Sequence, residues 1–155
     1  MGGIMSIQKG IYAASMSIFN QDLSLDIDST IKHSERLIGE GLHGSIFFGS
    51  TGCAQLISSD EKKELITKLY NNKFKEHFLI GTGTNAINEN AEIMKHSIKN
   101  GIDRFLLMPP AYYQYNNDGA YSFYANVIQK VPESKIILYN FEKLSGYKFT
   151  IQIMK

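Results

Sequence analysis

The feature that most restricts the fold is an alternation of short apolar runs with longer segments of helical spacing. Five runs have the composition of β-strands: residues 10–18, 45–48, 78–81, 104–108 and 135–141. They recur about every 30 residues, the length of one strand and one helix in a parallel unit. The alternation therefore predicts an α/β fold built from consecutive parallel βα units.

Segments with apolar residues at helical spacing follow the strands. We expect helices over residues 28–40, 59–72, a segment that ends near 100–101, and 118–131. Ser58 and Glu61 have the spacing of a capping box, which supports a helix start at residue 59. The tail, residues 149–155, is interpreted as the first turns of another helix with Thr150 as its N-cap.

Two architectures fit this pattern, a doubly wound sheet and a barrel of eight βα units, and the periodicity does not choose between them. In both, the loops after the carboxyl ends of the strands line the ligand site. The segments to inspect are therefore FNQD, GSTGC, GTGTN, PPAYYQY and YNFEKLSG.

Composition and charge narrow the class of partner. Hydrophobic residues make up 43% of the chain and charged residues 20%, enough apolar side chain for a core. Sixteen basic and fifteen acidic residues give a net charge of +1 without blocks of like charge, so we expect no nucleic acid and no membrane as partner. The start MGGIMSIQKG lacks the pattern of a leader, and Cys53, the single cysteine, favours a reducing compartment. We expect a cytoplasmic protein with a small-molecule or protein partner.

The loop GSTGC offers glycines that let the backbone approach a ligand, and Ser50 and Thr51 add hydroxyl groups. Such a turn suits a carboxylate or phosphate. The alternative is a plain tight turn between strand and helix. The full GxGxxG pattern of nucleotide-binding loops is absent.

Tyrosines gather after the fourth strand, where Tyr112, Tyr113 and Tyr115 either relay protons or cover apolar surface, and the covering role is favoured. Tyr139 differs, because it interrupts the apolar run IILYNF and its hydroxyl needs a partner or faces a central site. Cys53 is interpreted as structural. The histidines fall opposite the strand-end loops and are expected to be surface or hydrogen-bonded residues: His33, His43, His77 and His96.

Taken in order, these motifs resemble the family of dihydrodipicolinate synthase and N-acetylneuraminate lyase, the pyruvate-dependent class I aldolases. GIYAASMSIF is similar to the first strand of that family, GSTGC to its GTTGE motif and GTGTNA to its third-strand turn. PPAYY resembles its PYY segment, and ILYN followed by SG resembles its YNxPxxTG stretch. The resemblance extends from residue 10 to the end of the chain.

The resemblance implies a (β/α)₈ barrel of which residues 1–155 are the N-terminal part, about five βα units. In this family a lysine near the end of the sixth strand forms a Schiff base with pyruvate or another 2-oxo acid. By position, Ser50, Thr51 and Gly49 would bind the carboxylate of the 2-oxo acid. Tyr139 would relay protons, and Tyr113 would enter the site of a neighbouring subunit and complete the relay with Ser50. We expect no cofactor and no bound metal.

Departures from the family pattern limit what carries over. Cys53 replaces the glutamate after GTTG, Ile18 replaces the proline of TPF, and Glu142 replaces the proline after YN. Leu144 takes the place of the arginine that dihydrodipicolinate synthases use for their dicarboxylate. This replacement argues for another 2-oxo acid aldolase or dehydratase.

The length is the largest departure, because eight-unit barrels need about 250 residues. The Schiff-base lysine would lie beyond Lys155, and Lys143 does not match its position. We therefore expect the chain to be inactive alone. As protein partners we expect further copies of the chain in a homo-oligomer, or a complementing C-terminal half. The alternatives are a non-catalytic degenerate or split half barrel that needs a partner chain, and an unrelated doubly wound binding domain.

Overall fold

The computed structural model describes residues 7–154, so the residues MGGIMS at the start and Lys155 at the end of the expected tail helix lie outside the described part. The strands are β1 (Tyr12–Ala14), β2 (Gly44–Phe47), β3 (Phe78–Gly81), β4 (Arg104–Leu107) and β5 (Lys135–Leu138). The helices are α1 (Ile27–Gly39), α2 (Ser59–Lys68), α3 (Ile87–Lys99), α4 (Asn117–Lys130) and the single turn α5 (Glu142–Ser145). Two 3₁₀ turns, Ala54–Leu56 and Lys75–His77, complete the order.

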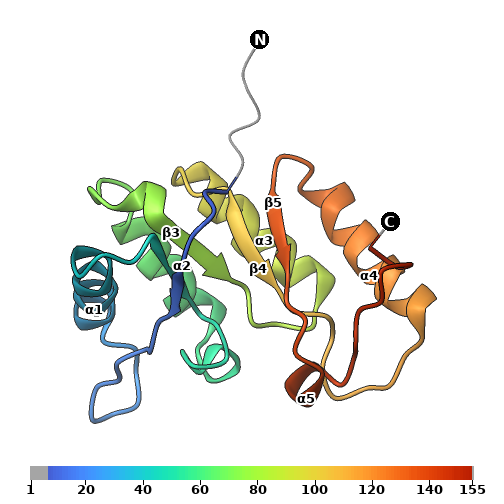
Figure 1. Cartoon of the computed structure of the whole chain (residues 1–155). Coiled ribbons are helices and arrows are strands. Elements are labelled where there is room, and N and C mark those ends of the chain that lie inside the picture. Colours follow the sequence, from blue (N-terminus) through green and yellow to red (C-terminus); the bar gives the residue numbers. More distant parts are fainter. Residues whose placement is uncertain (1–6, 155) are drawn as a thin grey trace.

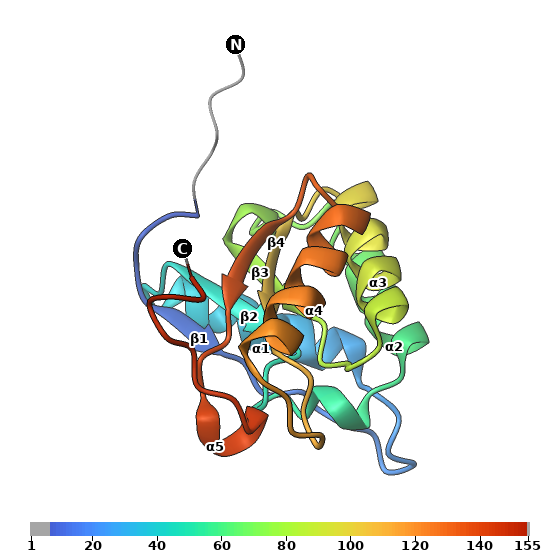
Figure 2. The same cartoon turned by 90° about the vertical axis from the view of Figure 1, so that its right-hand side faces the viewer.

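The five strands form one parallel sheet in the order β1-β2-β3-β4-β5 (Figure 1). A doubly wound sheet reverses its strand order at a switch point and carries helices on both faces. Here the order never reverses, and consecutive helices from α1 to α4 contact one another on one face. Figure 2 shows α2, α3 and α4 together on that side of the sheet. The topology is that of a barrel wall, which excludes the doubly wound alternative.

The core lies between the sheet and the helices. Alternate strand residues point into it, and they are almost fully buried: Phe47, Phe78, Ile80, Phe105 and Leu107. Because side chains alternate across a strand, Ile46, Leu79 and Leu106 point to the opposite face. That face carries the cavity described below.

The two outer strands, β1 and β5, are shorter than the sequence predicted. Beyond Ala14, the Ser15 amide still donates to the Ile46 carbonyl (3.2 Å), but the Ile18 amide turns to the Thr30 hydroxyl (3.0 Å) and leaves the sheet. The Tyr139 amide continues the ladder to Leu107 (3.0 Å), after which the chain enters α5, which the sequence did not predict. Residues 151–154 form turns, so the helix expected in the tail is wrong over the described residues.

Close approach of β2 and β3 depends on a glycine. A Cβ atom at Gly81 would lie 2.3 Å from the Phe48 carbonyl oxygen and 3.1 Å from that of Phe47. Both obstacles are backbone atoms of a buried strand, so neither can move cheaply.

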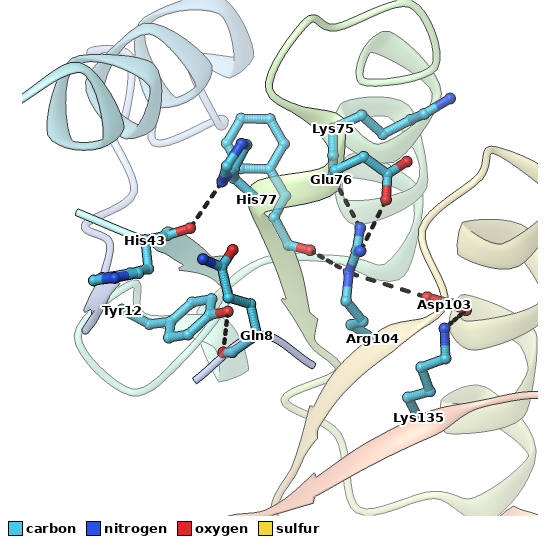
Figure 3. Close-up of polar contacts among 10 residues, drawn as sticks. Gln8, Tyr12, His43, Lys75, Glu76, His77, Asp103, Arg104 and Lys135 are labelled. Carbon is cyan, nitrogen blue, oxygen red and sulfur yellow. Dashed lines mark hydrogen bonds and ion pairs between the residues drawn. The ribbon is translucent and has the colours of Figure 1, made fainter. Parts of the chain in front are cut away.

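The amino ends of the strands are joined by satisfied polar contacts (Figure 3). Arg104, 8% exposed, donates to the Phe78 carbonyl (3.3 Å), the Lys75 carbonyl (3.0 Å) and the Glu76 carboxylate (3.0 Å). Lys135 binds Asp103 at 2.6 Å and so links β5 to β4.

Three of the four histidines are hydrogen-bonded, as expected. His43 accepts from the Ile11 amide (3.1 Å), His77 contacts the His43 carbonyl (2.9 Å), and His96 contacts the Lys63 carbonyl (3.0 Å). Figure 3 places His43 and His77 at the amino ends of the strands. The His43 and His77 contacts link the segments that precede β1, β2 and β3.

Strands β1 and β5 each pair on one side within residues 7–154. Leu107 and Leu138 are register partners on the helix-facing side of the sheet, yet Leu107 is fully buried and Leu138 is 36% exposed. The helix that follows β4 is α4, of 14 residues, whereas β5 is followed within the described residues by the four-residue turn α5. None of the helices in the described range is long and apolar enough to cross a membrane.

Gly81→Ala should lower the free energy of unfolding by at least about 2 kcal/mol, because overpacking against backbone forces the strands apart. Urea denaturation measures the loss. Gly39→Ala is the matched control, since a Cβ at the end of α1 meets nothing within 4 Å and alanine favours a helix by up to about 1 kcal/mol. Equal effects of the two substitutions would show that the β2–β3 contact is not tight.

Candidate functional site

A cavity of about 350 Å³ opens at the carboxyl ends of β2 to β5, where the sequence analysis placed the site. It receives residues from four strand-end segments and from α5. Its lining is Phe48, Gly49, Ser50, Cys53, Ala54, Gln55, Leu56, Gly83, Leu106, Met108, Tyr139 and Leu144. The lining is mostly apolar and carries no charged side chain among the described residues, which suits a small organic molecule held by a few hydroxyl groups.

Ser50 and Tyr139 meet at this cavity although 89 residues separate them in the chain. The Ser50 Oγ and Tyr139 hydroxyl atoms are 3.2 Å apart, and either can donate. Parallel pairing brings the ends of β2 and β5 to the same edge, so two residues proposed separately from the sequence form one hydrogen-bonded pair. Such a pair can pass a proton between a bound molecule and solvent.

The turn after β2 has a strained backbone. Phe48 and Cys53 have positive φ angles of 58° and 52°, a region costly for residues with a side chain. The Cys53 amide donates to the Ser50 carbonyl (3.1 Å), and the Ala54 amide donates to that of Gly49 (3.3 Å). These contacts hold the turn that presents the Ser50 hydroxyl to the cavity.

The two glycines of GSTGC have different roles. At Gly52 a Cβ would lie 2.8 Å from the Ser15 carbonyl oxygen, and the Ser17 hydroxyl donates to the Gly52 carbonyl (2.7 Å). Gly52 is therefore required for packing against the segment after β1. At Gly49 a Cβ would meet nothing within 4 Å, so open space for a ligand lies beside it. Thr51 is exposed beside Ser50 and is absent from the lining.

Tyr113 is not brought together with Ser50 and Tyr139 in this chain. It is 72% exposed and packs edge-to-face on Tyr112, with ring centroids 5.0 Å apart. Tyr112 is 91% exposed and has a φ angle of 80°. The two rings project from the loop after β4, and an apolar covering role within this chain is excluded for both by their exposure.

Several lining residues escaped the sequence analysis. Leu106 and Met108 belong to β4 and its end, where alternation with the buried Leu107 could have placed them on the cavity side. Leu144, which the family resemblance placed at the position of a substrate-binding arginine, does line the cavity, from the turn α5 that the sequence did not predict. Cys53 was interpreted as structural, but it is exposed and lines the cavity.

An aromatic cluster fixes the segment that carries Leu144. Tyr147 stacks on Tyr115 with centroids 5.3 Å apart and donates to the Asn117 side chain (2.7 Å). Phe149 packs on Tyr124, whose hydroxyl donates to the Leu107 carbonyl (2.9 Å). The segment after β5 is thus held against α4, and α5 stays at the rim of the cavity.

Burial controls the chemistry of this cluster. It raises the pKa of Tyr115 to about 12 and also raises the pKa of Tyr124. The Tyr115 hydroxyl is buried and has no hydrogen-bond partner among residues 7–154. These tyrosines are neutral packing groups rather than proton relays.

The chain resembles known enzymes over nearly all its described length. The profile of the Dihydrodipicolinate synthetase family matches residues 7–155. A 4-hydroxy-tetrahydrodipicolinate synthase of Bartonella bacilliformis is 30% identical over 148 residues, 95% of this chain and 50% of the relative. An L-threo-3-deoxy-hexylosonate aldolase of Aspergillus niger is 30% identical over 144 residues, 87% of this chain and 43% of the relative.

A solved structure shares the fold. A prophage protein of the dihydrodipicolinic acid synthase family from E. coli K12, crystallised in complex with pyruvate, superposes with a TM-score of 0.85 at 26% identity. The superposition covers 99% of this chain and 50% of that one. The chain therefore spans about half the length of the relatives it matches.

Tyr115→Phe should leave the free energy of unfolding unchanged or raise it by up to about 1 kcal/mol, because it removes a buried hydroxyl without a partner. Tyr124→Phe, the matched control, should lose about 1 kcal/mol with its hydrogen bond to Leu107. Urea denaturation at pH 8 compares them.

The same variant has a pH signature. The folded pKa of about 12 for Tyr115 exceeds its ordinary value of 10.0, so its contribution is complete below pH 10 and is lost as the pH rises toward 12. Stability of the unaltered chain should therefore fall more steeply over that interval than that of Tyr115→Phe. Parallel slopes would contradict the burial of Tyr115.

Proposed function

Because the chain belongs to the dihydrodipicolinate synthetase family, we propose that it supplies the carboxylate-binding and proton-relaying part of a Schiff-base-forming 2-oxo acid aldolase or lyase. The observation that carries the proposal is the 3.2 Å contact between Ser50 and Tyr139 at the cavity. In this proposal residues 1–155 are the N-terminal part of one barrel.

The 2-oxo acid is of the pyruvate type, and its carboxylate binds at Gly49, Ser50 and Thr51. Open space beside Gly49 and the Ser50 hydroxyl at the cavity support this placement. The family member crystallised with pyruvate supports the class of ligand. The apolar Leu144 at the rim favours a second substrate or leaving group without a carboxylate at that position.

Tyr139 passes a proton between the reacting carbon centre and Ser50. A phenol hydrogen-bonded to a serine hydroxyl can accept a proton at one end of the pair as the other end releases one. Tyr113 extends this relay from a second copy of the chain, a role supported by its exposure on the loop after β4.

The nucleophile comes from outside this chain. A lysine amine forms the iminium that accepts electrons when the carbon–carbon bond breaks. No lysine lines the cavity within residues 7–154, and Lys143 on α5 is exposed and absent from the lining. We therefore propose that the chain alone is inactive.

Cys53, the single cysteine, supports a reducing, cytoplasmic location.

The second candidate function is a non-catalytic half barrel that pairs with another chain. Within residues 7–154 the outer edges of β1 and β5 are unpaired and Leu138 is exposed. These features favour it, because an open sheet edge can pair with a further strand. The two candidates differ in whether the completed barrel carries a Schiff-base lysine.

Pyruvate should perturb the amide signals of residues 49–51 when it is titrated into the chain and followed by NMR. Ser50→Ala should weaken binding about tenfold or more, because a hydrogen bond to a charged group contributes about 1.5–3 kcal/mol. Ser122→Ala on the exposed side of α4 is the matched control and should bind as the unaltered chain does. Equal affinities of all three proteins would contradict the carboxylate site.

Borohydride with pyruvate should leave the mass of the chain unchanged, since no amine is available at the cavity. With the separately expressed C-terminal half of the Bartonella bacilliformis relative, reduction should attach pyruvate to that half. An adduct on this chain alone would contradict the proposal that the nucleophile comes from another chain. Stable pairing without an adduct would favour the non-catalytic half barrel.

A further inference from the structure

The first turns of α2 contact the ends of two other βα units. The Glu61 carboxylate accepts from the Leu25 amide (2.8 Å), and the Ser59 hydroxyl donates to Glu89 on α3. Lys62 Nζ donates to the carbonyl oxygen of Thr82 (2.9 Å), directly after β3. Of these partners, Thr82 directly precedes Gly83, which lines the cavity.

Lys62 is an unusual member of this set because only 3% of it is exposed. Lysine is rarely buried, since desolvation penalises the ammonium ion. Burial lowers the pKa of Lys62, and the nearby Glu89 and Glu61 carboxylates oppose that shift. Because burying the Lys62 ammonium group costs desolvation free energy, we expect the group to make a contact that an apolar side chain of the same size could not make.

The carbonyl that Lys62 binds belongs to the GTGTNA turn. Asn90 donates to the carbonyls of Thr84 and Ala86 at 2.9 Å each, and the Thr84 hydroxyl donates to Glu89. These contacts all come from α3, which continues from the turn. Two residues attach the turn to other elements: Lys62 attaches it to α2, and Asn85 attaches it to Ala111 after β4.

The turn forms one wall of the cavity. Gly83, with a φ angle of 62°, follows Thr82 and lines the cavity. A Cβ on Gly83 would lie 2.3 Å from that of Ala54, so the two backbones are in close contact. Ala54 in turn donates to the Gly49 carbonyl (3.3 Å). Contacts therefore run without a gap from Lys62 to the turn that carries Ser50.

We propose that Lys62 is a positioning residue of the candidate site: its ammonium group holds the Thr82–Gly83 peptide and thereby sets the wall of the cavity beside Gly49 and Ser50. The inference rests on the proposed function only for its ligand, pyruvate. Lys62 itself is absent from the cavity lining, so it acts through Gly83 and Ala54.

Lys62→Met in the full chain tests this role, because methionine fills a similar volume without charge. We expect the variant to be folded without urea but to unfold at a lower urea concentration, because the buried Thr82 carbonyl loses its hydrogen bond from Lys62. The Kd for pyruvate should rise about tenfold, within the range over which residues that do not touch a ligand modulate binding. The ligand-free amide signals of Gly83 and Ala54 should shift in the same variant.

Lys63→Met is the matched control on the same helix. The Lys63 ammonium pairs with Glu92 at 3.6 Å, away from the turn, so affinity and amide signals should stay unchanged. Unshifted Gly83 and Ala54 signals with unchanged affinity in Lys62→Met would overturn the proposal. If the unaltered chain does not bind pyruvate, the proposed function fails, and the amide signals still decide the role of Lys62.

A second measurement needs no variant and so does not depend on one folding. In the unaltered chain the ¹³C signal of the Thr82 carbonyl should titrate together with Lys62 Nζ, at a pH below the ordinary 10.5. The facing carboxylates of Glu61 and Glu89 have lowered pKa values and stay charged over that range. If the ¹³C signal of the Thr82 carbonyl does not change as Lys62 titrates, the proposal is overturned.

Discussion

Parallel pairing of five consecutive strands is the interaction on which the rest of this structure depends. Because neighbours in sequence are neighbours in the sheet, each connecting helix returns over the same face and packs against the one before it. The same geometry collects every strand's carboxyl end at one edge. Ser50 after β2 and Tyr139 after β5 can therefore meet across 89 residues of chain.

The two ends of the sheet differ in their polar contacts and in their backbone strain. At the amino ends, Arg104 and Asp103 have satisfied partners and tie three strands together. At the carboxyl ends, Phe48 and Cys53 have strained backbones and border a cavity. Strain of this kind persists only where the surroundings enforce it, and here the packing of Gly52 and Gly81 against backbone does so.

The free edges of β1 and β5 explain why we interpret the cavity as part of a larger site in a complete barrel. Leu138 has the same orientation as its partner Leu107 but is 36% exposed where Leu107 is fully buried, and β1 and β5 have free edges within residues 7–154. A barrel closes such edges by adding strands. The cavity lining likewise holds the hydroxyl groups that the proposed chemistry needs but no amine.

The sequence by itself determined the βα alternation, the presence of five strands and the positions of the strand-end loops, because periodicity and capping are local properties. It also identified Ser50 and Tyr139 as residues of interest, since a serine in a glycine-rich turn and a tyrosine in an apolar strand each break a local pattern. The sequence predicted β1 and β5 too long, missed the turn α5, and wrongly predicted a helix in the tail. There, long-range contacts such as Ile18 with Thr30, and Tyr147 with Tyr115, outweigh local preference.

Periodicity left a barrel wall and a doubly wound sheet open; the family resemblance predicted the barrel, and the tertiary structure confirmed it through its strand order. The tertiary structure alone distinguished Gly52, required for packing, from Gly49, beside open space, since the two glycines differ in what surrounds them rather than in their neighbours in sequence. It also placed Cys53, Leu106 and Met108 at the cavity and buried Lys62 against the turn after β3. Each of these depends on which distant segments touch, and that is settled when the strands pair and the helices pack.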